Sequence, residues 1–142
     1  MNPEIEAFVQ QPYLAVLSTV SASGRPQSTV LWYVFEQGAF WFNVGKDSQK
    51  ARNIRRSPHV SLTIDERTWP YKSAVIYGQA EEVAFDEEQA LRIAVRYVGR
   101  EDGSAMHRAM MAGEERVRMR LLPDRVAWMD FSGWDYKSLA GQ

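Results

Sequence analysis

Short β-type segments separated by turn residues make up most of the chain, and this pattern limits the fold more than any other feature. In HVSLTID, apolar residues at 60, 62 and 64 alternate with polar ones, as in a strand buried on one face. Strands are predicted over residues 13–20, 27–36, 39–44, 59–65, 71–83, 116–122 and 125–131, the last two joined by a turn at PD. Because they follow one another in runs, without strand–helix–strand alternation, a small antiparallel barrel with peripheral helices is favoured.

Helices are predicted where the apolar spacing changes to a helical period. Asn2 caps a short first helix, Asp47 or Ser48 caps one that ends near residue 56, and Asp86 caps one that ends at Gly99. A further short helix is predicted within residues 104–113. Gly78 marks a bulge or a close approach inside its strand. At 142 residues, the length predicts a single domain spanning residues 1–142.

Composition removes several classes of function. The formal net charge is -1, which argues against a nucleic-acid-binding surface spread over the protein. The chain has no cysteine and only two histidines, so we expect no metal site and no thiol chemistry. The N-terminus does not resemble a signal peptide and no apolar run is long enough to cross a bilayer, which predicts a cytoplasmic protein without membrane contact.

The segment GKDSQKARNIRRSP gathers positive charge in a chain that is slightly acidic overall. A helix that begins at Ser48 would direct free backbone N–H groups at an anion, with Lys50 on its flank and Arg52 on the same face as the serine. The alternative is a helix with its basic residues in solvent, where Arg55 and Arg56 favour the C-terminal end without any ligand. Composition alone leaves both interpretations open.

The order of three segments narrows the choice. GRPQSTVLWYVFEQGAFWFNV runs into GKDSQKARNIRRSPHVSL, and WPYKSAVIYGQAEEV follows. Over about residues 5–131 the chain resembles the pyridoxamine 5'-phosphate oxidase-like split barrels, which bind FMN or the deazaflavin coenzyme F420. The most specific element is Ser48-x-Lys50-x-x-Asn53 before a proline and an alternating strand. The resemblance implies a mainly β (α+β) fold, a six- to seven-stranded antiparallel split β-barrel with peripheral helices. It also implies a homodimer with the cofactor at the interface.

The resemblance also assigns candidate cofactor-binding residues. The phosphate end would be held by Ser48, Gln49, Lys50, Arg52 and Asn53. The ring system would lie along Gln27, Ser28, Thr29, Val30, Leu31 and Trp32, with Trp41 to Asn43 contributed by the next strand. The second subunit would add an aromatic wall, for which the candidates are Trp69, Tyr71 and Trp134.

Two departures from the family pattern bear on the cofactor. Gln49 and Gln27 stand where FMN-binding members usually carry arginine, which would weaken a site for a dianionic phosphate. We therefore favour F420, with FMN as the second choice, and expect no oxidation of vitamin B6. The implied function is a flavoprotein-type oxidoreductase that transfers hydride to a small conjugated or aromatic substrate. The alternatives are a flavin- or haem-binding carrier without turnover and a nucleic-acid binder that uses the basic helix.

No catalytic residue can be assigned from the sequence, although Tyr71 is a candidate proton donor to a substrate oxygen. We interpret His107 as an ordinary helix residue rather than a haem ligand, and the methionines around it as core filler or a lid. The row Arg116, Arg118 and Arg120 is predicted to be the solvent face of a strand. If it faced the cofactor instead, it could bind the carboxylates of a polyglutamate tail.

Overall fold

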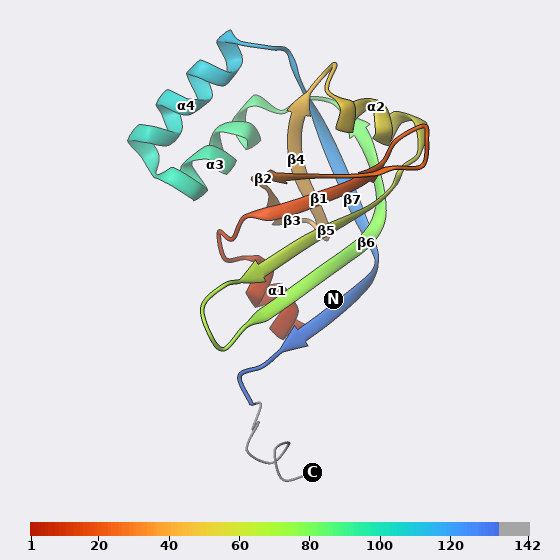
Figure 1. The fold of residues 1–142 in the computed structure, drawn as a ribbon. Coiled ribbons are helices and arrows are strands. Elements are labelled where there is room, and N and C mark those ends of the chain that lie inside the picture. The colour runs from red at the N-terminus through yellow and green to blue at the C-terminus, as the bar shows by residue number, and fades with distance from the viewer. Residues whose placement is uncertain (134–142) are drawn as a thin grey trace.

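The computed structural model describes residues 1–133, and its seven strands form one sheet that curls into a half-barrel (Figure 1). The strands are β1 (Ala15–Val20), β2 (Pro26–Leu31), β3 (Val34–Glu36), β4 (Ala39–Gly45), β5 (His59–Glu66), β6 (Lys72–Val83) and β7 (Arg116–Asp130). They lie in the order β2-β1-β5-β6-β7-β4-β3, and every neighbouring pair is antiparallel. The predicted fold, a mainly β antiparallel split barrel with peripheral helices, is therefore confirmed.

Four helices connect or flank the strands: α1 (Pro3–Val9), α2 (Gln49–Arg56), α3 (Glu87–Val98) and α4 (Arg100–Ala112). The side chains of Asn2, Ser48 and Asp86 accept hydrogen bonds from backbone N–H groups three residues on, which confirms them as N-caps. The fourth helix is longer than the segment 104–113 that the sequence predicted. None of the helices in residues 1–133 is long and apolar enough to cross a membrane.

The single strand predicted over residues 27–36 is wrong, because the structure divides it into β2 and β3. β2 pairs with β1 at one edge of the sheet, whereas β3 pairs with β4 at the other edge. The break falls at Trp32 and Tyr33, whose side chains are held by distant partners. Tyr33 is fully buried and donates to the carbonyl of Val9 at 2.7 Å, and Trp32 stacks on Tyr97. These contacts fix the position of the two residues at which the chain crosses from one edge of the sheet to the other.

The predicted turn at residues 123–124 is also wrong, because β7 continues through it as one strand. On β6, Tyr77 pairs with Arg125 and the next residue, Gly78, pairs with Pro123. Asp124 is thus an extra residue in the β7 strand, which is the arrangement of a bulge. A Cβ atom on Gly78 would lie 2.1 Å from the carbonyl oxygen of Leu122. The prediction of a bulge and close approach at this glycine is confirmed.

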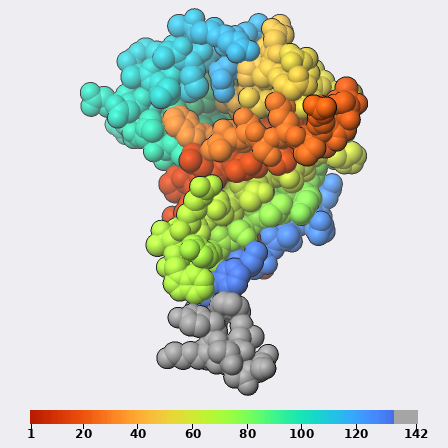
Figure 2. Space-filling view, in the orientation of Figure 1, coloured from red at the N-terminus to blue at the C-terminus, as the bar shows by residue number. Residues whose placement is uncertain are grey.

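The inward-facing side chains of the sheet form the hydrophobic core, and α1 closes one end of it with Phe8 and Val9. The largest fully buried core side chains include Leu17, Phe40, Phe42, Leu62, Ile64, Ile76, Met119 and Leu121. Figures 1 and 2 are viewed towards β1, β5 and β6, with no helix in front of these strands. The hairpin of α3 and α4, helix α2 and the edge strand β2 gather at the opposite end from α1.

Candidate functional site

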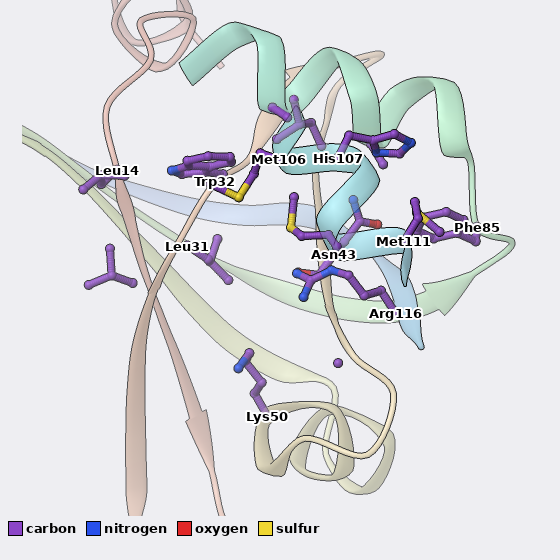
Figure 3. A pocket seen from close by; sticks show the side chains of 16 residues that line it. Leu14, Leu31, Trp32, Asn43, Lys50, Phe85, Met106, His107, Met111 and Arg116 are labelled. Atoms are coloured by element: carbon purple, nitrogen blue, oxygen red, sulfur yellow. The ribbon is translucent and has the colours of Figure 1, made fainter. Parts of the chain in front are cut away.

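A cavity of about 370 Å³ lies between the edge strand β2, the start of α2, the adjoining ends of β4 and β7, and the hairpin of α3 and α4 (Figure 3). This volume lies within the range of pockets that hold small molecules. The cavity is lined by Leu14, Val30, Leu31, Trp32, Asn43, Gly45, Lys50, Phe85, Ala90, Ile93, Ala94, Met106, His107, Met110, Met111 and Arg116. Most of these side chains are apolar, so its few polar groups determine which ligands it can hold.

Two cations reach the cavity from different elements, Lys50 from α2 and Arg116 from β7 (Figure 3). Among residues 1–133, Lys50 makes no hydrogen bond or ion pair. Arg116 donates from Nη2 to the carbonyl oxygen of Asn43 at 2.8 Å, and no carboxylate in the described chain forms an ion pair with it. Burial lowers the pKa of the Arg116 guanidinium, while the charge of Glu114 acts in the opposite direction. The site thus holds positive charge without a matched anion.

Asn43 adds a polar group that lacks a partner. It lies on β4 and faces the cavity, and its Oδ1 atom is buried without a hydrogen bond. A buried acceptor without a donor costs free energy, which a ligand N–H or O–H at this place would recover. Asn43 was a predicted site residue, and the structure places it in the cavity.

The roof of the cavity comes from α3, α4 and the segment before α3. Phe85, Met106, Met110 and Met111 present flexible apolar surface, and Met106 and Met111 are about two-fifths exposed, at 42% and 41%. The two helices pack closely, since a Cβ atom on Gly103 would lie 2.7 Å from the Val95 backbone. Such a surface can accept flat apolar molecules of varied outline.

His107 is the one histidine among the lining residues. Its side chain is buried at 7% exposure, and its Nε2 atom lies 3.3 Å from Oε1 of Glu87 at the start of α3. This contact ties α4 to α3. Within residues 1–133 there is no group of three or more histidine, cysteine or acidic side chains placed to hold a metal ion.

Half of the residues predicted to lie along the ring system line the cavity. Val30, Leu31 and Trp32 do so, and Trp32 is held by a parallel stack on Tyr97 with ring centroids 5.1 Å apart. The first half of β2 does not reach the cavity. Gln27 accepts from Asn53 at 3.0 Å, Ser28 lies 3.1 Å from the Ser18 hydroxyl, and Thr29 is not among the lining residues. Because β2 pairs only with β1 in the described sheet, some of its backbone groups remain free for a ligand.

Lys50 is the only residue of the predicted phosphate group on α2 that lines the cavity. The Ser48 hydroxyl donates to the carbonyl of Gly45 at 2.7 Å and caps the helix. Arg52 turns back to Asp47 and Gln49 at the start of its own helix. These bonds order the helix start from which Lys50 projects.

Asn53 is buried at 2% exposure and anchors α2 to the sheet. Its Nδ2 group donates to Thr19 Oγ1 and to Gln27 Oε1, both at 3.0 Å, and its Oδ1 accepts from Gln49 at 2.7 Å. Every polar atom of the amide has a partner, so this predicted ligand has a positioning role within the protomer.

The predicted aromatic wall lies away from the cavity. Trp69 and Tyr71 follow β5 and are about half exposed, at 49% and 47%, with their rings edge to face at 5.2 Å. Neither lines the cavity of its own protomer, so a role for them requires a second subunit. Trp134 lies outside the described residues. The role of all three stays a prediction.

The prediction that the arginine row faces solvent is wrong. The Arg118 side chain is only 16% exposed, lies over the Trp41 ring at 4.7 Å and donates to Gln89 of α3. Arg120 also lies over this ring and pairs with Glu81. Arg116, which the sequence suggested as a cofactor contact only in the alternative interpretation of this row, lines the cavity. The alternation along β7 predicted a strand, but not that α3 and α4 would cover its arginine face.

Comparison of the sequence with known proteins identifies a family. A family described as pyridoxamine 5'-phosphate oxidase matches residues 1–133. The chain belongs to this family. It is 35% identical over 86 residues to a pyridoxine/pyridoxamine 5'-phosphate oxidase of Streptomyces avermitilis, a match that covers 60% of this chain and 38% of the relative. The match to the haem oxygenase HutZ of Vibrio cholerae is 32% identical over 66 residues, covering 46% and 38% of the two chains. The chain therefore spans about two-fifths of the length of these curated relatives.

Solved structures resemble nearly the whole chain. A conserved hypothetical protein from Mycobacterium tuberculosis superposes with a TM-score of 0.75 at 30% identity, covering 93% of this chain and 86% of that one. A structure named F420 reductase gives a TM-score of 0.70 at 23% identity, covering 86% and 94%. At that identity, the second likeness shows a shared fold.

Proposed function

We propose that this protein binds a flavin-type cofactor, F420 in preference to FMN, and uses it as an oxidoreductase on small conjugated or aromatic substrates. The observation that supports this most directly is the cavity itself. It combines two cations without a matched anion, Lys50 and Arg116, with a long apolar remainder that includes Trp32. A ligand made of a ring system joined to an anionic tail would complement this cavity, because its tail can face the cations and its ring the apolar remainder.

Different residues of the cavity would bind the anionic tail and the ring of the cofactor. Lys50 and Arg116 would hold the anionic tail, and Asn43 Oδ1 would accept a hydrogen bond from a ring N–H. Val30, Leu31 and the methionine roof would exclude water from the ring face, while free backbone groups of β2 would orient its edge. The bound cofactor would supply hydride transfer, and the protein would supply position and shielding.

The preference for F420 rests on how few cations are available at the tail. Gln27 and Gln49, which replace arginines of the FMN-binding pattern, both bond to Asn53 and do not line the cavity. The basic residues Arg52, Arg55 and Arg56 have partners elsewhere in the protomer. At the phosphate group itself, the phosphodiester of F420 has one charge to be compensated, whereas the phosphomonoester of FMN has two. The likeness to the F420 reductase fold agrees with this choice.

The proposal includes a homodimer, and the sheet face without a helix in front of it is the candidate interface. Short, uncharged side chains occupy six adjoining outward positions of this face: Val16, Ser18, Ser61, Thr63, Ser73 and Val75. Light scattering after size exclusion should give twice the mass of the chain, and Val75→Arg should reduce this to one chain. Glu101→Arg, on exposed α4, is the matched control. A wild-type protein that elutes as a monomer would contradict this part of the proposal.

A haem- or flavin-binding carrier is the second candidate. His107 and the neighbouring methionines in the cavity favour it, as does the match to HutZ. Haem titration separates this candidate from the first, because a histidine ligand would give a shifted Soret band that His107→Ala abolishes.

The main experiment is a set of equilibrium titrations with F420, FMN and haem, followed by a turnover assay. We expect micromolar or tighter binding of F420 and weaker binding of FMN. Reduced F420 should then be oxidised by some of a panel of enones, quinones and nitroaromatics faster than without protein. Failure to bind either F420 or FMN would overturn the proposal, whereas tight binding without accelerated oxidation would favour the carrier.

A further inference from the structure

A third charge, on Glu114 in the segment between α4 and β7, lies next to Gly45. Gly45 lines the cavity beside Arg116, with which it pairs across β4 and β7. A Cβ atom on Gly45 would lie 2.5 Å from Glu114 Oε1 and 2.9 Å from Oε2. The carboxylate therefore occupies the space that a side chain at position 45 would fill.

Within residues 1–133, this carboxylate makes no hydrogen bond or ion pair, and Lys50 likewise has no partner. Arg116 is close enough to Glu114 for the negative charge to favour its ionised form, although the two are not paired. Glu114 and Arg116 thus lie beside Gly45, while Lys50 lines the same cavity, and none of the three forms an ion pair within the described residues.

We propose that Glu114 is a specificity determinant of the site, selecting a phosphate group with a single negative charge, as in a phosphodiester, over one with two. This rests on the proposed function, which it deepens by naming the charge of the preferred ligand. Lys50 and Arg116 contribute two positive charges and Glu114 one negative charge, which leaves one to be balanced. No other lining residue has an acidic side chain, a lysine or an arginine, and the imidazole of His107 faces Glu87. A phosphodiester group, the form of the phosphate in F420, matches this charge, whereas the phosphomonoester group of FMN exceeds it above its second pKa of about 6.

The size of the effect follows from Coulomb's law. The repulsion between Glu114 and the ligand is proportional to the ligand charge, so it is twice as large for a dianion as for a monoanion at the same place. Glu114 is exposed, and solvent screens the interaction. Neutralising it should therefore strengthen the binding of a dianion by about four- to tenfold and of a monoanion by about two- to threefold.

The test compares three ligands that share one ring and ribityl chain and differ in the group at its end: the 5'-phosphate, its methyl phosphodiester and the uncharged 5'-alcohol. They are made in the flavin or the 8-hydroxy-5-deazaflavin series, whichever ring the wild-type protein binds, and titrated at about pH 8, above the second phosphate pKa of about 6. Glu114→Gln keeps the shape of the side chain and removes its charge. Glu115→Gln is the matched control, because Glu115 is the next residue and pairs with Lys46 at 3.4 Å on the surface.

With Glu114→Gln we expect a gain in affinity that increases with ligand charge and is absent for the 5'-alcohol, while Glu115→Gln leaves all three affinities within about twofold. Equal changes for the three ligands, or the same graded gain in both variants, would overturn the role of Glu114 alone. If the wild-type protein binds neither ring, the proposed function fails, and this inference fails with it. The two failures are therefore distinguishable.

Discussion

Helix α2 carries four cationic side chains in eight residues, and the first five residues of β7 carry three. The two segments are far apart in the sequence, yet each sends one cation to the cavity. On α2 this is Lys50, while Arg52 bonds to its own helix start and Arg55 to Glu82. On β7 it is Arg116.

The remaining cations of both segments stabilise the protomer. Arg56 donates to the carbonyl of Val20, and Arg118 and Arg120 lie over the ring of Trp41. A dense run of basic residues is therefore a poor guide to the number of charges available to a ligand. The informative quantity is the number of cations that converge on one cavity without an ion pair in the described chain, and here α2 and β7 contribute one each.

Replacing Lys50 should give the largest effect on ligand binding. Lys50→Met keeps most of the apolar stem but removes the charge, so the affinity for the anionic cofactor should fall by roughly 1–3 kcal/mol. Fluorescence titration with F420 or FMN measures this. Arg52→Met is the matched control on the same helix and should change the affinity little, because Arg52 faces Asp47 and Gln49. Equal losses of affinity in the two variants would show that binding depends on the total positive charge of α2 and not on the position of Lys50 in the cavity.

The next effect concerns how α2 is held in place. Asn53→Leu removes a buried amide that bonds to Thr19, Gln27 and Gln49, which leaves their polar groups unpaired. The free energy of unfolding should fall by about 1–3 kcal/mol, measured by urea denaturation. Asn53→Asp tests the same position with an acceptor in place of the donor. An unchanged unfolding midpoint in Asn53→Leu would contradict the anchoring role.

Local patterns predicted those parts of this site that depend on neighbouring residues. The Ser48 cap, the extent of α2 and the strand over residues 59–65 follow from caps and alternation, and all appear in the structure. The placement of Lys50 in the cavity follows from the family resemblance together with that helix.

Features that depend on distant partners were not predictable in this way. Both halves of residues 27–36 have strand-type sequence, so the sequence does not show where they divide. The division follows from the hydrogen bond of Tyr33 to α1 and the stack of Trp32 on α3. Likewise, alternation along β7 shows that Arg116 and Arg118 share a face but not what covers it. Two features of the sequence together could have indicated this cover. The tryptophan at position 41 and the apolar face of the helix after Asp86 both require another surface to pack against.

A smaller effect is expected for a cation of α2 that serves the fold. Arg55 donates to Glu82 at 2.6 and 3.0 Å and to the carbonyl of Lys46 at 2.8 Å, on a partly exposed surface. Arg55→Met should lower the free energy of unfolding by about 0.5–1 kcal/mol and leave cofactor affinity unchanged. Denaturation and titration of the same preparation measure both. A loss of affinity as large as that of Lys50→Met would remove the distinction between the two residues.

The smallest effect is expected for Arg116 on β7. Its replacement should change the free energy of unfolding in the opposite direction to the replacement of Arg55 on α2. Burial lowers the pKa of Arg116, so its charged form is less favourable in the folded protein than in the unfolded chain. Arg116→Met should therefore raise the free energy of unfolding without ligand by up to about 0.5 kcal/mol, despite the lost bond to Asn43, while weakening cofactor binding. Urea denaturation of the ligand-free protein, with Arg55→Met as the comparison, measures the sign. A clear loss of stability in Arg116→Met would mean that this cation, like Arg55, serves the fold first.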